Sequence, residues 1–239
     1  MLCRPEVSLG GFVKILATLF AAALLVSGCA ESYQWSKKHP DYHQAPYGEL
    51  AIVGVENAFV LTRSAWFAKR LQVGTDSIQI LGTRFCAQAM LNEMRGAYGK
   101  LNVLPDAVLA NAPEESQKLD ERIFMKGKLP EQGIVIKDST GFAPPQILII
   151  HEVIVGTDLN RANFFDYALI HNESPDRTAA KNISAIVSYT LWDNEKQRPL
   201  FSAVDEIQHP VLAMTWNDLE ILVRLAVSEI RKNLYMGAK

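Results

Sequence analysis

The sequence contains little cysteine and no excess of charge of either sign. Three cysteines among 239 residues are too few for the multiple disulfides that replace a large core in small secreted domains. The 24 basic and 26 acidic residues nearly cancel, so the chain has no general electrostatic reason to bind nucleic acid. Because 49% of the residues are hydrophobic, we expect a globular fold, and the length suits one domain.

Motifs of common enzyme classes are also missing. The chain has no G-x-S-x-G elbow, no H-E-x-x-H pair, no Walker A loop and no G-x-G-x-x-G after a strand. His39, Asp41 and His43 are ligand-type residues close in sequence, but structural zinc needs about four ligands held by a fold. We therefore predict no catalytic residue, no metal site and no cofactor.

Residues 1–28 have the features of an export signal. Arg4 and Lys14 precede an uncharged run, Ile15 to Val26, which would rise about 18 Å as a helix. That length is too short for a hydrocarbon core of about 30 Å, and the run has no polar face that would suit a buried amphipathic helix. We predict that this segment is a cleaved signal peptide.

The end of this signal, Leu25-Val26-Ser27-Gly28-Cys29, resembles the lipobox of bacterial lipoproteins. In that family the chain is cut before the cysteine, and acyl chains are added to its thiol and to the new amine. The resemblance implies that Cys29 is lipidated, and two or more acyl chains anchor a protein stably to a membrane. Ala30, in place of the aspartate that favours inner-membrane retention, implies an outer-membrane anchor facing the periplasm. The alternative is an ordinary signal peptide in which the cysteine is incidental.

The mature chain divides into a polar segment and a globular region. We predict that residues 29–48 comprise the lipidated cysteine and a flexible tether, and that residues 49–239 fold as a single domain. The fold class is α/β (α+β), with a mixed sheet of about five strands, two long helices and one shorter helix. The principal strands are expected at residues 50–55, 101–104, 146–155, 183–192 and 200–207, with shorter additions at 58–62 and 133–136. The helices are expected at residues 78–98, 113–125 and 219–234, the last beginning after a capping box at Thr215–Asp218.

His151 and Glu152 are two polar residues inside the most apolar strand. Neighbouring strand residues point to opposite faces, so the two side chains are not expected to act on one substrate. Each is expected to be satisfied by neighbouring strands or helix ends. As an alternative, His151 or His171 meets a carboxylate from Asp205 or Glu206 and forms the site of an envelope hydrolase.

Residues 156–182 form a long connection without a clear period. Phe164, Phe165 and Tyr167 lie within it. Such connections are often functional, and a locally packed excursion is the alternative. We predict that these three aromatic residues contact a partner.

The order of elements resembles a periplasmic α/β group. The group includes the curli-secretion pore lipoprotein, the outer-membrane activators of penicillin-binding proteins and the amino-terminal domain of the Tol translocation protein. The similarity is carried by Leu50–Val55, by a helix that ends in Gly99 before Leu101–Leu104, and by Tyr189–Asp193 before a hairpin. It spans residues 49–235 and identifies no functional residue.

The resemblance implies a non-catalytic accessory module that binds an envelope protein. A subunit of an oligomeric export pore is a further alternative, although a pore needs amphipathic membrane hairpins. The candidate segments for such hairpins are Ala58–Leu71 and Phe164–His171, and Arg63, Lys69 and Arg70 interrupt the first of them. The sequence leaves the partner and the oligomeric state open.

Overall fold

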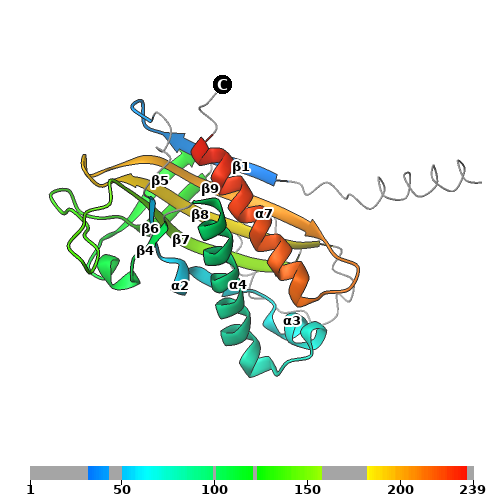
Figure 1. The fold of residues 1–239 in the computed structure, drawn as a ribbon. Helices are drawn as coiled ribbons and strands as arrows, with labels where there is room; N and C mark the ends of the chain where they lie inside the picture. The colour runs from blue at the N-terminus through cyan, green and yellow to red at the C-terminus, as the bar shows by residue number, and fades with distance from the viewer. Residues whose placement is uncertain (1–31, 43–49, 99–100, 121–122, 158–181, 236–239) are drawn as a thin grey trace, which may run out of the picture. The chain divides into compact units, whose positions relative to one another are not determined.

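The computed structural model describes residues 32–42, 50–98, 101–120, 123–157 and 182–235 (Figure 1). The strands are β1 (Ser32–Lys38), β2 (Leu50–Val53), β3 (Phe59–Leu61), β4 (Leu101–Val103), β5 (Glu114–Asp120), β6 (Ile123–Lys128), β7 (Gln146–Thr157), β8 (Asn182–Asp193) and β9 (Arg198–Pro210). The helices are α2 (Val55–Ala58), α3 (Ser64–Leu71), α4 (Thr75–Ala97), α7 (Trp216–Tyr235) and the 3-10 helix η1 (Asp106–Leu109). The predicted mixed α/β class is confirmed.

A mixed seven-stranded sheet organises the domain. Its strand order is β1-β9-β8-β7-β2-β4, and β3 pairs with β7 beyond the end of β2. The pairs β1–β9, β9–β8 and β8–β7 are antiparallel, whereas β2 and β3 run parallel to β7 and β4 runs parallel to β2. The predicted hairpin is formed by β8 and β9, which turn at residues 194–197.

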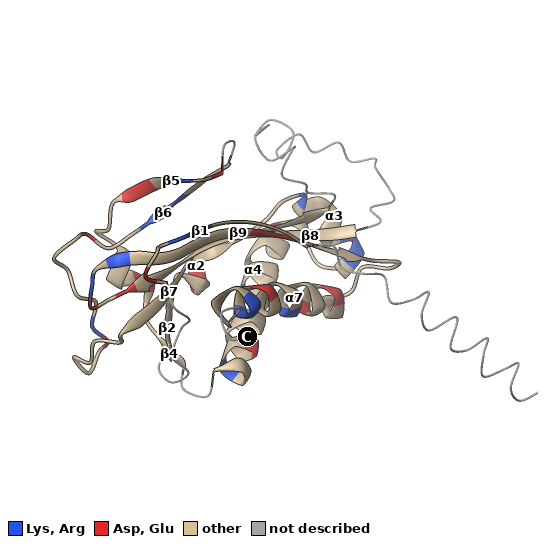
Figure 2. Cartoon of the chain, turned by 90° about the horizontal axis from the view of Figure 1, so that it is seen from above, with Lys and Arg blue, Asp and Glu red and all other residues tan. Residues whose placement is uncertain are grey.

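The two faces of the sheet are covered by different elements. Helices α4 and α7 lie on one face, and the β5–β6 hairpin lies on the other (Figure 2). Alternate residues of β8 point into the core on the helix side, as the period of two predicts. These residues are Ile183, Ala185, Val187, Tyr189 and Leu191. On the hairpin side, Met125 packs with Ile154, Ile186 and Val204.

Helices α4 and α7 form where the apolar period predicted them. Cys86, Met90 and Met94 are buried on α4, and Phe85 of this helix contacts Trp216 of α7 at a ring separation of 5.0 Å. The predicted capping box before α7 is formed by Thr215 and Asp218. The Thr215 amide donates to Asp218 Oδ2 at 2.8 Å, and the Asp218 amide donates to Thr215 Oγ1. None of the helices in the described ranges has the length and apolar character needed to cross a bilayer.

The structure corrects the predicted helix at residues 113–125. This stretch begins the β5–β6 hairpin, in which Ile123 and Met125 point inward and Phe124 points to solvent. Pro113 and the two glutamates after it suit the first turn of a helix, but burial of Met125 against the sheet determines the outcome. The helix α3 was not predicted from the sequence; it lies within Ala58–Leu71, the first candidate segment for a membrane hairpin.

Two further expectations were wrong. Residues 133–136 form no strand, because the backbone of Ile136 bonds the Asn194 side chain through both its amide and its carbonyl. Residues 32–38, expected to be part of a flexible tether, form the edge strand β1 and pair along their whole length with β9, from Ser32–Ile207 to Lys38–Phe201.

Candidate functional site

The residues singled out in the sequence divide into described and undescribed positions. Cys29, Phe164, Phe165, Tyr167 and His171 lie outside the described residues, so their predicted roles stay predictions. His151, Glu152, Asp205 and Glu206 are described. Among the residues with described positions, no three His, Cys, Asp or Glu side chains gather to form a metal site.

His151 lies at an irregularity of β7 that the sequence does not reveal. Ile150 pairs with Tyr189 but Glu152 pairs with Ser188, so His151 is an extra residue in the strand. The expected alternation of His151 and Glu152 between opposite faces therefore does not apply. His151 Nε2 lies 2.9 Å from Thr190 Oγ1.

The surroundings of His151 favour a neutral imidazole. Burial lowers the pKa of His151 to about 4. Gly127 of the hairpin packs on the ring so closely that a Cβ atom there would lie 2.2 Å from Nδ1. Thr190 Oγ1 in turn lies 3.1 Å from Ser202 Oγ, so the imidazole ends a chain of hydroxyl groups. This arrangement differs from the histidine–carboxylate pair that the hydrolase alternative needs.

Asp205 belongs to a separate network on the helix side of the sheet. Its carboxylate, 1% exposed, accepts hydrogen bonds at Oδ2 from the Tyr189 hydroxyl at 2.9 Å and from Asn233 Nδ2 at 3.1 Å. The Gln34 side chain also bonds it. Burial raises the pKa of Asp205 to about 7, although the bond from Tyr189 acts in the opposite direction. The network joins β1, β8, β9 and α7, and its contacts are those of a structural link.

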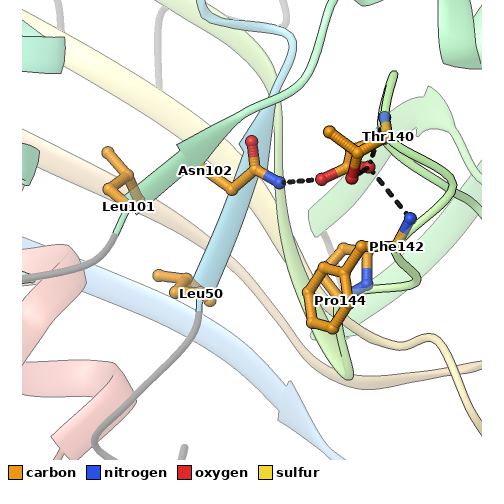
Figure 3. Close-up of a pocket in the computed structure, with 7 residues that line it drawn as sticks. Leu50, Leu101, Asn102, Thr140, Phe142 and Pro144 are labelled. Carbon is orange, nitrogen blue, oxygen red and sulfur yellow. Dashed lines mark hydrogen bonds between the residues drawn. The ribbon is translucent and has the colours of Figure 1, made fainter.

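An open pocket of about 500 Å³ lies beside β4, the last strand in the sheet order (Figure 3). Its apolar lining comes from the start of β2, from β4 and from the loop before β7. Its polar lining comes from β4 and from the same loop. The lining residues are Leu50, Leu101, Asn102, Asp138, Thr140, Phe142 and Pro144.

Asp138 fixes the loop that forms one wall of this pocket. Its Oδ1 accepts from the Thr140 amide at 2.8 Å, the Thr140 hydroxyl at 2.6 Å and the Phe142 amide at 3.0 Å. Its Oδ2 accepts from Asn102 Nδ2 at 2.9 Å, which ties the loop to β4 (Figure 3). These bonds hold the pKa of Asp138 below its usual value, and the bond from the Thr140 hydroxyl has the largest effect.

A buried asparagine fixes the loop from the other side. Asn194, at the β8–β9 turn, accepts from the Ile136 amide and donates to the carbonyls of Ile136 and Pro144. The pocket is therefore preformed by hydrogen bonds from two directions. Sequence reasoning missed it, although Asp138-Ser-Thr140 is a spacing typical of a side-chain-stabilised turn.

Three apolar side chains of the segment between β6 and β7 are exposed, and one of them, Phe142, also lines the pocket. Ile134 is 50% exposed, Val135 is 41% exposed and Phe142 is 46% exposed. A preformed pocket with mixed lining, and with the half-exposed ring of Phe142 in its wall, is suited to binding, and its one carboxylate already accepts four hydrogen bonds.

Comparison with known proteins identifies no family for the chain. No family model and no curated protein matches it. Among solved structures, the PelC dodecamer from Paraburkholderia phytofirmans is similar at 11% identity, covering 85% of this chain and 97% of that one, with a TM-score of 0.41. A variant PelC dodecamer from the same organism is similar at 10% identity, covering 83% and 95%, with a TM-score of 0.34. These values are too low to transfer properties of PelC to this chain.

Proposed function

We propose that the chain is a lipid-anchored accessory module of the bacterial envelope, and that it binds an envelope protein without catalysing a reaction. The lipobox at Cys29 supports anchoring, with an outer-membrane position facing the periplasm. The observation that carries the binding role is the preformed pocket beside β4 with Ile134, Val135 and Phe142 exposed on its loop.

The occupant that we propose is a segment of a protein with an apolar side chain. Such a side chain fits the pocket among Leu50, Leu101 and Pro144, while the half-exposed Phe142 supplies further apolar contact area. Apolar side chains exposed together on one loop are typical of protein interfaces, whereas a small ligand would need only the pocket itself.

Site-specific crosslinking in intact cells tests this proposal. A photoreactive amino acid at Val135 is expected to capture one envelope protein reproducibly, and Phe142→Ser is expected to abolish the capture. The matched control is Phe124→Ser, because Phe124 is similarly exposed but lies on the hairpin. Equal loss of capture in both variants, or undiminished capture with Phe142→Ser, would contradict the proposed site. Crosslinks to the chain itself alone would favour the oligomeric alternative.

The connection predicted at 156–182, whose first two residues belong to β7 and whose last begins β8, remains a second proposed contact. Its support is its length and its aromatic residues Phe164, Phe165 and Tyr167. Replacing the three aromatics with serine is expected to weaken capture while the melting temperature stays unchanged. If capture is undiminished, the contact is confined to other surfaces of the chain.

A further inference from the structure

The two ends of the sheet have different surroundings. At one end, named here the Ser32 end, β1 begins at Ser32, which pairs with Ile207, and β7 finishes at Thr157. At the other, named the Asn194 end, the β8–β9 turn bonds the loop of the pocket described above. The twelve residues of β7 rise about 3.3 Å each, so the two ends are separated by about 36 Å.

The position of β1 limits the distance between the predicted lipid and the Ser32 end. Three peptide units connect Cys29 to Ser32. An extended chain of this length spans at most about 11 Å. Because Ser32 is already paired with β9, acyl chains on Cys29 would hold the Ser32 end close to the bilayer surface.

Basic side chains gather near the same end. Arg63 Nη1 donates to Thr157 Oγ1 at 2.9 Å, which places the start of α3 at the end of β7. Residues 63–84 contain the four bases Arg63, Lys69, Arg70 and Arg84 against the single acid Asp76, although the whole chain has a net charge of −2. Lys69, Arg70 and Arg84 are exposed, and in Figure 2 basic positions are marked in blue on the ribbon at α3.

Exposed apolar side chains accompany these charges. Leu212, in the loop that follows β9, is fully exposed, and Ala213 beside it is exposed as well. Ile80 and Leu81 are exposed on the first turns of α4, which begins three residues after α3. Basic residues and exposed aliphatic side chains at the same end of a domain are typical of surfaces that contact the headgroup region of a bilayer.

We propose that the Ser32 end, with α3 and the loop of Leu212, docks on a surface of anionic phospholipid. This inference rests on the proposed function, because it requires the lipid on Cys29. Lys69, Arg70 and Arg84 face the phosphates, and Leu212 enters the headgroup layer. The pocket beside β4 then points away from the bilayer, at a height of about 36 Å set by the length of β7.

Fluorescence quenching of the lipidated protein on vesicles tests this orientation. A dye is attached through Leu212→Cys or, as the control, through Glu195→Cys in the turn at the Asn194 end. Cys86 stays unlabelled because its thiol is buried. The vesicles contain phosphatidylglycerol or only phosphatidylcholine, each with a lipid-bound quencher. We expect quenching of the dye at 212 on the anionic vesicles, and little quenching of the dye at 195.

Charge reversal provides the second arm. Each basic side chain at an anionic surface changes the local partition about fivefold, so Lys69→Glu with Arg70→Glu is expected to remove most of the quenching at 212. The matched control is Lys137→Glu with Lys196→Glu, two exposed bases near the Asn194 end. Thermal melting of each variant confirms that the fold is retained.

The outcomes separate this inference from the proposed function. Failure of the wild-type protein to float with vesicles would refute the lipid anchor, and the docking surface with it. Flotation without quenching at 212, or with equal quenching at 195, would refute the orientation alone. Equal quenching on neutral and anionic vesicles, or no effect of charge reversal, would refute recognition of anionic lipid.

Discussion

Replacing the buried carboxyl of Asp205 is expected to change how stability depends on pH. In the folded protein the pKa of Asp205 is about 7, against an ordinary value of 3.8, because the group is buried beneath α7. The folded state therefore binds more protons than the unfolded state between these two values. Stability from this group is fully present below pH 4, falls as the pH rises to about 7 and is constant above.

The size of the effect follows from the two pKa values. Their full separation is equivalent to about 4 kcal/mol, of which about 3 kcal/mol lies between pH 5 and pH 8. His151 acts in the opposite direction, since its folded pKa of about 4 lies below the ordinary 6.5. Its stability contribution rises by about 2 kcal/mol over the same range. The pH-dependent stability contributions of Asp205 and His151 thus partly cancel in the wild type. The difference in unfolding free energy between a variant and the wild type isolates the contribution of the replaced group.

Urea unfolding of wild type and Asp205→Asn between pH 5 and pH 8 measures this difference. The asparagine keeps an oxygen that can accept from Tyr189, and any fixed cost of the substitution is the same at every pH. We expect the free energy of unfolding of the variant, relative to wild type, to rise by about 3 kcal/mol across the range. Glu195→Gln, at an exposed turn, serves as the control. A difference that is constant with pH for Asp205→Asn would refute the assignment of a protonated, buried carboxyl.

Three further predictions concern the interior. For His151→Gln, the stability relative to wild type is expected to fall by about 2 kcal/mol between pH 5 and pH 8 in the same urea assay, and a constant difference would argue against a buried neutral imidazole. Gly127→Ala is expected to lower stability by about 1–3 kcal/mol, because its Cβ would overlap the His151 ring. The control is Gly96→Ala, at an open helical position, which should instead raise stability by up to about 1 kcal/mol. Equal melting temperatures of the two variants would contradict the close packing at Gly127. The Cys86 thiol is buried and its pKa is raised to about 12, so thiol reagents should label it only at the rate of unfolding; rapid labelling of the folded protein would show that the core is open there.

The sequence predicted the central part of the fold because local pattern and burial agree there. The apolar run at residues 146–155 and the alternation at 183–192 became β7 and β8, in the centre of the sheet. The period of α4 and the Thr215–Asp218 pair similarly predicted both long helices.

The errors occur where contacts distant in sequence determine the structure. Residues 32–38 are mostly exposed and polar, so nothing local indicates that they pair with β9. The β5–β6 hairpin depends on Met125 meeting Ile154 and Val204, and these partners follow it in the chain.

The candidate site was harder to predict than the fold. Its walls are joined by side chains from three places in the chain, namely Asn102, Asp138 and Asn194. The sequence pointed instead to His151, whose position in a strand irregularity places its imidazole within hydrogen-bond distance of Thr190.

Both proposals depend on acylation of Cys29, which intact-mass measurement of the protein purified from membranes tests most directly. We expect a chain that begins at Cys29, lacks residues 1–28 and carries two or three acyl chains, whereas Cys29→Ser is expected to leave the precursor uncut and without acyl groups. A wild-type chain cleaved elsewhere, or one with a free thiol at Cys29, would contradict the account of a lipid-anchored binding module.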